Sequence, residues 1–599
     1  MAPIAETAPD SLESQIGHYP EWAKELARRY FTKTLNQFLI HGNVRDLVPS
    51  VDDGGERSYV SLRDFLANDL FAARDIVIFY DRSAGIHFAD RESQADFNRA
   101  LSGYDTIFGT EYAKRLPRDP VRVFTVLENY FRLRLADGKR IAVVVDYAET
   151  IVPMSEAASS SAEDRNAIVF LQKWSHDPFL LRHDFSLCLL TENLTDLNQQ
   201  LIQSPYTAEI AIPIPSSERR AAFVSWFLEK GDRSKRFDTL SDVAPEVFAQ
   251  NTAGLGYVQL RTILADLFEN GNRLTFDLLS RRKKELIEAE AYGLLEFVET
   301  RYTLDMVAGL DEAKSHLRSA ASALRQGRPD VLPMGYLVSG PVGTGKTFMI
   351  TCFSGEIGIP MVMLKNFRSQ WQGVTEGNLE KILTLLRAMN PVAVMIDEAD
   401  AALGNRNQSG DSGVSSRVFS QIAQAMSDTR FRGRIIWFLV TARPDLMPVD
   451  LKRQGRAEEH IALFYPHTRE EREELINVML RRTGVDLKVE ELPEALFDEE
   501  RTFSGADIEA LITRAKFRAV AGAAQSNGDA TVTPELLEET IADFIPPSYP
   551  MEVEMQTLVA VLECTSREML PPKFRDMKRE DVVKRIQELK RMLGASAFL

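Results

Sequence analysis

The sequence predicts an α/β protein with two similar sheet cores, each followed by a small helical lid domain, and a helical tail at the end. Three observations support this prediction. Strand-like apolar runs alternate with helical stretches, which is typical of a mostly parallel sheet covered by helices. The same order of elements, including an acid-tipped strand and then a polar-tipped strand, occurs twice with a spacing of about 250 residues. Both copies continue into helices, so the repeat includes a lid as well as a sheet.

The two copies contain matching sets of strand-like runs. In the first copy these runs are Ile76–Tyr80, Arg140–Asp146, Phe185–Asn193 and Ala208–Pro213. In the second copy they are Tyr336–Ser339, Val392–Glu398, Ile435–Thr441 and Ile461–Pro466. Apolar residues at helical spacing predict one helix over Glu21–Leu47 and another over Val121–Leu135.

The length of 599 residues exceeds what one hydrophobic core supports, so several domains are expected. The expected parts are an N-terminal segment (1–29), a first module (30–272, with its core at about 30–213 and its lid at about 214–272), a linker helix (273–300), a large domain (301–466), a small helical domain (467–545) and a helical tail (546–599). The tail contains the most basic stretch, Lys573–Arg591, for which a solvated amphipathic helix is favoured over a site for an anionic partner.

Charge and composition exclude several classes of protein. The net charge of -16 argues against a general polyanion binder, so nucleic acid is not an expected partner. The three cysteines are far apart and form no C-x-x-C pair, which indicates neither a zinc knuckle nor a disulfide framework. We see no signal peptide in the first residues, and the longest apolar runs are strand-sized. A cytoplasmic location without membrane insertion is therefore expected.

The segment Gly340–Thr347, GPVGTGKT, fits the phosphate-binding pattern G-x-x-x-x-G-K-[ST]. A strand-like run precedes it and an apolar helical run follows, which is the setting that this motif requires. Backbone N–H groups of the loop and the helix N-terminus would hold the phosphates of ATP. Lys346 would reach the β- and γ-phosphates, and the Thr347 hydroxyl would bind Mg²⁺. The loop residues expected to contact the nucleotide are Pro341, Val342, Gly343, Thr344, Gly345, Lys346 and Thr347.

Two acids, Asp397 and Glu398, end a strand of the second copy. Both carboxylates should emerge at the sheet edge beside the phosphate loop. Asp397 is expected to hold Mg²⁺, directly or through water. Glu398 is expected to orient and polarise the attacking water, a role worth about 10²–10⁴ in rate. The pair therefore predicts hydrolysis of the nucleotide as well as binding.

The first copy lacks this chemistry. Residues 30–130 contain no match to the phosphate-binding pattern, and the glycine turn His41–Asp46 has neither its spacing nor its lysine. Asp146 ends the corresponding strand, but Tyr147 follows where the second copy has a glutamate. We expect the first copy to be a degenerate, structural P-loop-type module.

Five motifs of the second copy resemble those of the AAA+ ATPases. They are Leu304–Lys314, the phosphate loop, Ile396–Ala401, Leu451–Arg456 and Ser504–Asp507. The resemblance covers about residues 300–545 and is strongest to the branch of proteasomal ATPases, FtsH proteases and p97-type segregases. The layout with an inactive first module looks most like a two-module AAA family of cyanobacteria and chloroplasts. No H-E-x-x-H motif is present, so the chain itself is not expected to be a metalloprotease of the FtsH kind.

The resemblance implies further site residues. Val307, Ala308 and Gly309 would pack on the adenine, and Gly505 and Ala506 would close over the base from the small domain. Arg453 and Arg456 match arginines that this family points at the γ-phosphate of a neighbouring subunit. Because such an arginine acts in trans, the resemblance implies a ring, most often a homo-hexamer.

Two positions depart from the family pattern. Trp371, Gln372 and Gly373 fall where the family has an aromatic–aliphatic–glycine pore loop that grips a threaded polypeptide, but Gln372 is not aliphatic. Core packing is the alternative role for the tryptophan. At the end of the Ile435–Thr441 strand, Ala442 stands where a sensor asparagine is expected, with Thr441 and Arg443 as candidates to replace it.

These features predict an ATPase that binds ATP and Mg²⁺ in a ring and remodels, unfolds or disassembles a protein substrate, with slow or partner-stimulated turnover. The substrate or adaptor is not identified by the sequence. The alternative is an ATP-dependent assembly scaffold or switch that threads nothing. Ala442, Gln372 and the degenerate first module favour this alternative, whereas Glu398, Trp371 and the two arginines favour the motor.

Overall fold

The chain divides into two compact units in a computed structural model. The described residues are 16–31, 35–51, 54–154, 161–229, 231–271, 273–291, 293–365, 375–403, 414–488, 491–497, 503–526, 531–545 and 549–596. Unit 1 comprises residues 1–289 together with 376–388, and unit 2 comprises residues 290–375 and 389–599.

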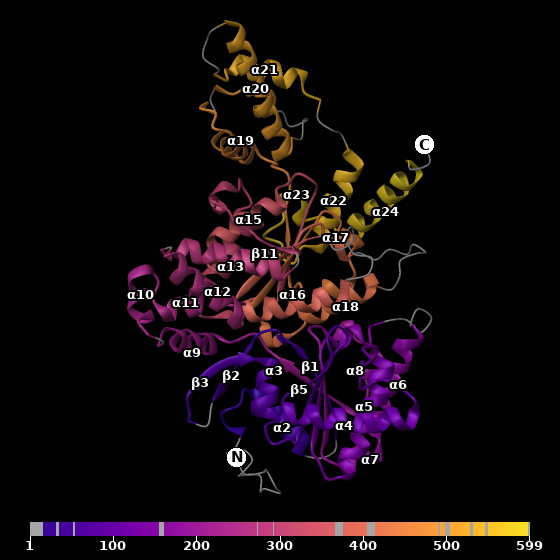
Figure 1. The fold of residues 1–599 in the computed structure, drawn as a ribbon. Helices are drawn as coiled ribbons and strands as arrows, with labels where there is room; N and C mark the ends of the chain where they lie inside the picture. The colour runs from indigo at the N-terminus through magenta and orange to yellow at the C-terminus, as the bar shows by residue number, and fades with distance from the viewer. Residues whose placement is uncertain are drawn as a thin grey trace. The chain divides into compact units, whose positions relative to one another are not determined.

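Unit 1 contains a six-stranded sheet with the strand order β5-β4-β6-β7-β1-β8. Figure 1 labels β1 and β5 of this sheet in the indigo to purple part of the ribbon. Neighbouring strands are parallel except at one edge, where β5 runs antiparallel to β4. The strands are β1 (Gln37–Gly42), β4 (Ile76–Asp81), β5 (Gly85–Phe88), β6 (Ile141–Val145), β7 (Phe185–Leu190) and β8 (Thr207–Ile212). A separate hairpin is formed by β2 (Leu47–Val51) and β3 (Arg57–Ser61).

Helices cover this sheet and continue into a lid. The helices of the sheet region are α2 (Glu21–Phe31), α3 (Leu62–Phe65), α4 (Arg91–Phe108), α5 (Pro120–Ala136), α6 (Ala162–His176), α7 (Pro178–Arg182) and α8 (Gln199–Ile202). The lid region contains α9 (Ser217–Leu228), α10 (Arg233–Leu240), α11 (Pro245–Asn251) and α12 (Tyr257–Asn270), followed by α13 (Phe276–Glu290). Local sequence sets the helix starts: the Asp119 side chain caps α5, whose first residue is proline, and Ser161 forms a capping box with Asp164.

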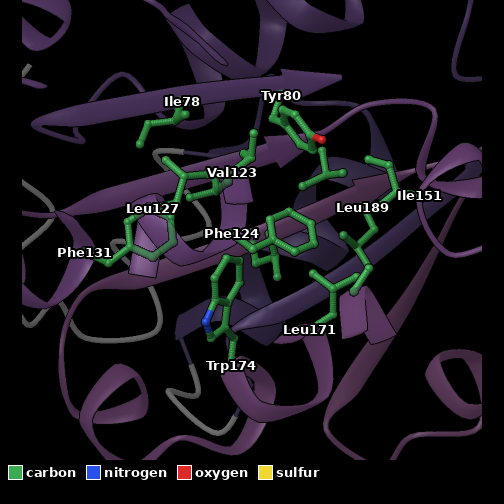
Figure 2. Close-up of a cluster of buried hydrophobic side chains, with 14 of the residues drawn as sticks. Ile78, Tyr80, Val123, Phe124, Leu127, Phe131, Ile151, Leu171, Trp174 and Leu189 are labelled. Atoms are coloured by element: carbon green, nitrogen blue, oxygen red, sulfur yellow. The ribbon is translucent and has the colours of Figure 1, made fainter. Parts of the chain in front are cut away.

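The core of unit 1 lies on both faces of the sheet. Figure 2 shows one face, where Ile78 and Tyr80 of β4 pack with Phe124, Phe131 and Trp174 of the covering helices. The Trp174 ring lies 5.2 Å from that of Phe124 and 5.3 Å from that of Phe131, measured between centroids. The alternate residues of β4 point to the other face, where they join a cluster that includes α2 and α3. A strand covered on both faces reads as a continuous apolar run.

This double burial explains one wrong prediction. The helix expected over Glu21–Leu47 ends at Phe31, and Gln37–Gly42 forms the central strand β1. Phe38, Leu39 and Ile40 are all buried because both faces of β1 are covered. A fully buried strand lacks the alternation that separates strands from helices in sequence, so periodicity alone could not find it.

Unit 2 contains a second six-stranded sheet, with the order β14-β10-β13-β12-β11-β9. Its strands are β9 (Leu295–Phe297), β10 (Gly335–Ser339), β11 (Met361–Leu364), β12 (Val392–Ile396), β13 (Ile435–Thr441) and β14 (Glu459–Ala462). All neighbours are parallel except β9, which is antiparallel to β11. Both sheets place their five parallel strands in the same spatial order: the fifth of them along the chain, then the first, fourth, third and second. In both sheets an antiparallel strand forms the edge beyond the second. The predicted pair of similar α/β cores is therefore confirmed.

Unit 2 also contains helices of three kinds. Those of the sheet region are α14 (Asp311–Arg325), α15 (Lys346–Ile357), α16 (Thr375–Met389), α17 (Ala399–Leu403) and α18 (Val414–Met426), although residues 376–388 of α16 group with unit 1. The lid contains α19 (Arg469–Thr483), α20 (Gly505–Ser526) and α21 (Pro534–Asp543). The tail contains α22 (Pro550–Glu563), α23 (Pro572–Arg575) and α24 (Arg579–Ser596), of which α22 and α24 share an apolar cluster.

The linker differs from its prediction as one helix over 273–300. The helix α13 ends at Glu290, and Leu295–Phe297 forms β9, with Leu295 opposite Leu364 of β11. Leu294 and Leu295 are 3 % and 1 % exposed, so burial on a sheet edge prevails over the helical spacing. Within the part of the chain that the structure describes, no helix is both long and apolar enough to cross a membrane.

Candidate nucleotide-binding site

The glycine loop of unit 2 connects β10 to α15, as its sequence requires. Two of its glycines have backbone conformations and surroundings that exclude a side chain. Gly343 has a φ of 85°, and an added Cβ would lie 2.7 Å from Cβ of Ser504 in the lid. Gly340 has a φ of 150°, and an added Cβ would lie 2.3 Å from the Leu463 carbonyl oxygen. The loop therefore passes close to both the sheet and the lid.

Lys346 is the first residue of α15 and lies folded under the loop. Its Nζ donates hydrogen bonds to the carbonyl oxygens of Gly340 at 2.9 Å and Pro341 at 2.8 Å. Burial lowers the pKa of the Lys346 ammonium to about 8, and the negative charges of Asp397 and Asp400 oppose this shift. The ammonium is thus held by neutral acceptors that phosphate oxygens can replace.

Thr347 and Asp397 bring two oxygen ligands together next to this lysine. The Thr347 hydroxyl donates to Oδ2 of Asp397 at 2.9 Å. Mg²⁺ is usually bound by one or two protein oxygens together with phosphate oxygens and water, and this pair suits that arrangement. Among the described residues, no group of three or more His, Cys, Asp or Glu side chains could hold a metal ion alone. Phosphate oxygens and water would supply the remaining ligands of a Mg²⁺ held by Thr347 and Asp397.

Glu398 follows Asp397 at the end of β12 with an exposed side chain. Its backbone has a φ of 47°, and its N–H donates to Oδ1 of Asp397 at 2.9 Å. Because a non-glycine residue with positive φ is uncommon, this turn is a special conformation that directs the two carboxylates differently. One carboxylate lies against Thr347, and the other remains open to solvent.

A pocket of about 680 Å³ lies beside the loop, within the range typical of small-molecule sites. Eight residues predicted to bind the nucleotide line this one pocket: Val307, Ala308, Gly309, Gly343, Thr344, Gly345, Gly505 and Ala506. The carbonyl oxygen of Val307 accepts a hydrogen bond from Nζ of the buried Lys314 at 3.1 Å, which holds this wall in place. Segments from the sheet region, the loop and the lid are thus brought together around one cavity.

Pro341 and Val342 do not line the pocket. Pro341 is buried, whereas the Val342 residue is 62 % exposed. The N–H of Val342 donates to Oε1 of Gln556 at 3.0 Å, and its carbonyl oxygen accepts from the Tyr465 hydroxyl. Both polar groups of Val342 are thus held by Gln556 and Tyr465, and Lys346 and Thr347 likewise do not line the pocket.

The residues after β13 show what surrounds Ala442. The Thr441 hydroxyl donates to Oδ1 of Asp400 at 2.6 Å and accepts from the N–H of Arg443. The Arg443 guanidinium instead pairs with Asp445, with Nε to Oδ1 at 2.9 Å. Of the two candidates to replace the asparagine, Thr441 is therefore bonded to Asp400, two residues after Glu398, whereas the Arg443 side chain is paired with Asp445.

The two predicted trans-acting arginines do not line the pocket of their own chain. The Arg453 side chain is 61 % exposed, with its Nε 3.4 Å from Asp450. The Arg456 side chain is 13 % exposed, and its Nη1 donates to the carbonyl oxygen of Asp450 at 2.6 Å. The expected pore-loop residues Trp371, Gln372 and Gly373 lie outside the described residues.

Sequence reasoning missed the contribution of the tail to this site. Glu568–Pro572 and Arg575 line the pocket, and Gln556 bonds to the glycine loop from 214 positions away. The tail sequence contains no nucleotide-binding motif, and a contact across such a separation has no signal in one sequence. Tyr465 lies within the predicted strand-like run Ile461–Pro466, beyond the end of β14 at Ala462, and its bond to Val342 likewise depends on the fold.

Unit 1 has its own side chains at the corresponding position. The Arg45 guanidinium lies 3.8 Å from the Tyr147 ring centroid and donates to Oδ1 of Asp146 at 2.8 Å. Its Nε is also 3.6 Å from Oε1 of Glu192, at the end of β7. Tyr147 has a φ of 50° and donates its N–H to Asp146, so it repeats the backbone turn of Glu398. The turn is kept, but an arginine now neutralises the acid.

Asp46 connects the sheet region of unit 1 directly to its lid. Its carboxylate accepts hydrogen bonds from the N–H groups of Tyr257 and Val258 at the start of α12, both at 2.8 Å. The Asn43 amide donates a third bond, also at 2.8 Å. Asp46 is 7 % exposed, and burial raises the pKa of its carboxyl although these bonds oppose the shift. The helix N-terminus that an anion could occupy is therefore taken by the chain itself.

The strand–loop–helix unit, the Lys346 ammonium and the Thr347–Asp397 pair define unit 2 as a P-loop nucleoside triphosphatase. Comparison with protein families extends this assignment. Residues 336–465 match the ATPase family associated with various cellular activities (AAA). Residues 8–213 match the N-terminal Rossmann-like domain of AAA+ chaperones, and residues 218–292 match their second helical domain. The chain belongs to the AAA+ ATPases, and the matched domain supports ATP hydrolase activity.

Individual relatives belong to several branches of this family. A cell division cycle protein 48 homolog of Archaeoglobus fulgidus is 26 % identical over 415 residues, covering 63 % of the chain and 54 % of the relative. An ATP-dependent zinc metalloprotease FtsH 1 of Salinibacter ruber is 30 % identical over 238 residues, covering 38 % and 34 %. An uncharacterized AAA domain-containing protein ycf46 of Guillardia theta is 27 % identical over 271 residues, covering 44 % and 52 %.

The matched part of the chain thus spans between about a third and about half of the length of these relatives. The matched AAA domain implies ATP with a divalent metal. AAA ATPases of this kind commonly form oligomeric rings and act on protein substrates.

Proposed function

We propose that the chain is an ATP-driven remodeller of a protein substrate that works as a ring, most simply a homo-hexamer. In this proposal the second module hydrolyses ATP and the first module serves as scaffold or partner-recognition module. The observation that carries the proposal is the division of the catalytic groups. Thr347 and Asp397 are bonded to each other at the glycine loop and Glu398 follows Asp397, whereas the exposed Arg453 pairs with Asp450.

The side chains of the second module have distinct roles in this proposal. Lys346 exchanges its two carbonyl acceptors for phosphate oxygens, which brings its charge to the site of bond breaking. Thr347 and Asp397 hold Mg²⁺. When bound, this ion neutralises the charge that develops on the phosphates. The exposed Glu398 carboxylate orients a water and accepts its proton, and the fixed turn at φ 47° keeps this carboxylate separate from Asp397.

Arg453 completes the site of a neighbouring subunit in this proposal. Its guanidinium is tethered only at 3.4 Å to Asp450, a residue whose own side chain is 64 % exposed, so little holds it back from another chain. An arginine that reaches the γ-phosphate stabilises transition-state charge and is worth about 10³–10⁵ in rate. Arg456 is more enclosed, so we propose that it mainly positions the Arg453 loop through its bond to Asp450.

A mixing experiment tests the division of groups between subunits. Lys346→Ala keeps the arginine but loses its own site, and Arg453→Ala keeps the site but loses the arginine. Each variant alone should lose nearly all ATPase activity. A 1:1 mixture should recover a clear fraction of it, because Lys346→Ala subunits supply arginines to intact sites. A mixture with no more ATPase activity than the sum of the two variants measured separately would refute the trans arrangement.

The ring itself is tested with Glu398→Gln, which should bind ATP without turning it over. Mass photometry should show a single large oligomer with ATP and smaller species without nucleotide. The identity of the substrate would follow from proteins retained by this variant and released from Lys346→Ala. A Glu398→Gln protein that stays monomeric with saturating ATP would contradict the proposal.

The second candidate function is a nucleotide-dependent scaffold or switch. The observation that favours it is Ala442, because the neighbouring Thr441 hydroxyl is already committed to Asp400 and no amide is available to hold a water. Trp371→Ala separates the two functions. In a motor this substitution should abolish remodelling of a bound protein and leave ATP binding intact, whereas in a switch it should leave both unchanged.

We also propose that the first module binds no nucleotide. Arg45 and Asp46 support this, since both side chains are bonded where a phosphate would need free donors. A Lys346→Ala chain should therefore bind no ATP at all by calorimetry. A Lys346→Ala chain that still bound one ATP would show that the first module binds nucleotide.

A further inference from the structure

We propose that the C-terminal tail is part of the adenine-nucleotide site, with Met569 forming a wall of the base pocket and Gln556 holding the phosphate loop. This inference rests on the proposed ATP-binding function and assigns further residues to it.

The tail is fixed to the edge strand of the sheet, next to the pocket. The N–H of His460 in β14 donates to the Thr565 hydroxyl at 2.9 Å, and the N–H of Thr565 donates back to the His460 carbonyl oxygen at 3.2 Å. The His460 ring contacts the Glu563 carbonyl oxygen at 2.7 Å, and Lys452 pairs with the Glu563 carboxylate. His460 is 6 % exposed, so this attachment is buried.

Apolar packing then directs the following segment into the pocket wall. Phe574 stacks on Phe464 with ring centroids 5.4 Å apart, and both belong to a buried cluster with Leu570. Met569 packs against the core cluster that contains Val307, the residue expected on the adenine side. Glu568–Pro572 therefore line the same cavity as Val307 and Gly309.

The second contact reaches the phosphate end. Gln556 of α22 accepts the N–H of Val342, and Tyr465 donates to the carbonyl oxygen of the same residue. Both polar groups of Val342 are thus held from outside the loop, directly before Gly343 and Thr344, whose N–H groups face the phosphate position in such loops. Loss of the Gln556 acceptor would leave the loop free to adopt other conformations, at a cost when phosphate binds.

The chemistry of this wall fits an adenine ring better than a charged ligand. Met569, Leu570 and Pro571 are apolar and line the pocket, and Met569 packs against the cluster that contains Val307. The Arg575 guanidinium is turned to the carbonyl oxygens of Leu570 and Glu568, at 2.7 and 2.9 Å, and so stabilises the segment itself. Because binding energies are linked, nucleotide should also tighten the docking of the tail by the same factor that the tail contributes to nucleotide affinity.

The test measures binding of ADP and GDP to the full-length protein with Mg²⁺ by calorimetry. Met569→Glu places a charge in the base wall and should weaken ADP at least about 10-fold, with a smaller effect on GDP. Gln556→Ala removes one hydrogen bond to the loop and should weaken ADP and GDP equally, by about 3- to 10-fold. The different base dependence separates the two roles and is not expected of a general loss of folding.

Matched controls lie in the same tail. Met577 is 41 % exposed and Gln587 is exposed on α24, so Met577→Glu and Gln587→Ala repeat the chemical changes away from the pocket and should leave both affinities unchanged. ADP affinities of Met569→Glu and Gln556→Ala equal to those of the controls would overturn the proposal. Two other results would refute the proposed ATPase function itself and not only the role of the tail. One is an unmodified chain that binds no nucleotide, and the other is a Lys346→Ala chain that binds nucleotide as tightly as the unmodified chain.

Discussion

Removal of the Asp46 carboxylate should release the lid of the first module from its sheet region. Asp46→Ala leaves the N–H groups of Tyr257 and Val258 without their acceptor at the start of α12. Loss of a helix cap alone costs about 0.5–2 kcal/mol. A buried donor left without a partner adds about 1–3 kcal/mol. Because water enters part of the space left by the side chain, we expect about 3 kcal/mol in total.

Amide hydrogen exchange of the full-length chain measures this effect locally, which matters because a protein of several domains does not unfold in one step. A loss of about 3 kcal/mol should speed exchange in α12 by about 10²-fold, since each 1.4 kcal/mol is a factor of ten. The matched control is Asp90→Ala, which removes an exposed cap from α4 in the same module. It should cost about 1 kcal/mol, confined to α4.

The result that would refute the reasoning is unchanged exchange in α12 with Asp46→Ala while α4 responds to Asp90→Ala. Gly256→Ala provides an independent check. An added Cβ at this position would lie 2.7 Å from Oδ2 of Asp46, so it should displace the carboxylate and also speed exchange in α12. In the unmodified chain ATP should not protect α12, since the Asp46 carboxylate already occupies the helix start.

Further substitutions test other parts of the structure. Ala442→Asn should raise ATP turnover by restoring a polar side chain beside the site, and an unchanged rate would argue that Thr441 already fills the role. Thr441→Val should lower turnover by about 10-fold without changing ADP affinity, measured by steady-state kinetics and calorimetry, because it removes the bond to Asp400. Trp174→Ala should destabilise unit 1 by about 3–5 kcal/mol in denaturant unfolding, and a loss below about 1 kcal/mol would contradict the packing in Figure 2. Burial lowers the pKa of Lys283 to about 8, so the unfolded chain binds the proton more tightly than the native one. Stability should therefore rise between about pH 8 and 10.5, and Lys283→Met should remove this rise and stabilise unit 1 at neutral pH by at most about 3 kcal/mol.

The sequence was most informative where function needs a short, continuous motif. Gly340–Thr347 could be recognised as a phosphate-loop motif because its glycines, Lys346 and Thr347 lie within one short, continuous stretch of the chain. Asp397 and Glu398 could be predicted because they directly follow an apolar strand-like run, and side chains at the end of a strand emerge at the edge of the sheet. Both motifs lie where their patterns predict, and the structure brings Thr347 to 2.9 Å from Asp397.

Periodicity failed where burial was complete. Periodicity predicts a helix at β1 because Phe38, Leu39 and Ile40 are all apolar and buried, so the sequence lacks the alternation of polar and apolar residues that marks a strand. Helical spacing likewise predicts that the linker helix continues through the edge strand β9. Three residues pair with β11, too few to establish an alternation.

The sequence by itself determined that one of two related modules keeps the phosphate-loop motif and an Asp–Glu pair at a strand end, from which a magnesium-binding pair and a water-activating acid are predicted. These features are local, so their spacing along the chain is enough to define them. Only the tertiary structure showed that Arg45 and Asp46 are bonded within the first module, that Gln556 accepts a hydrogen bond from the glycine loop and that Met569 packs beside Val307. The physical reason is distance along the chain: Asp46 meets Tyr257 across 211 positions and Val342 meets Gln556 across 214. Contacts of that range are selected by packing of whole elements, which no local pattern encodes.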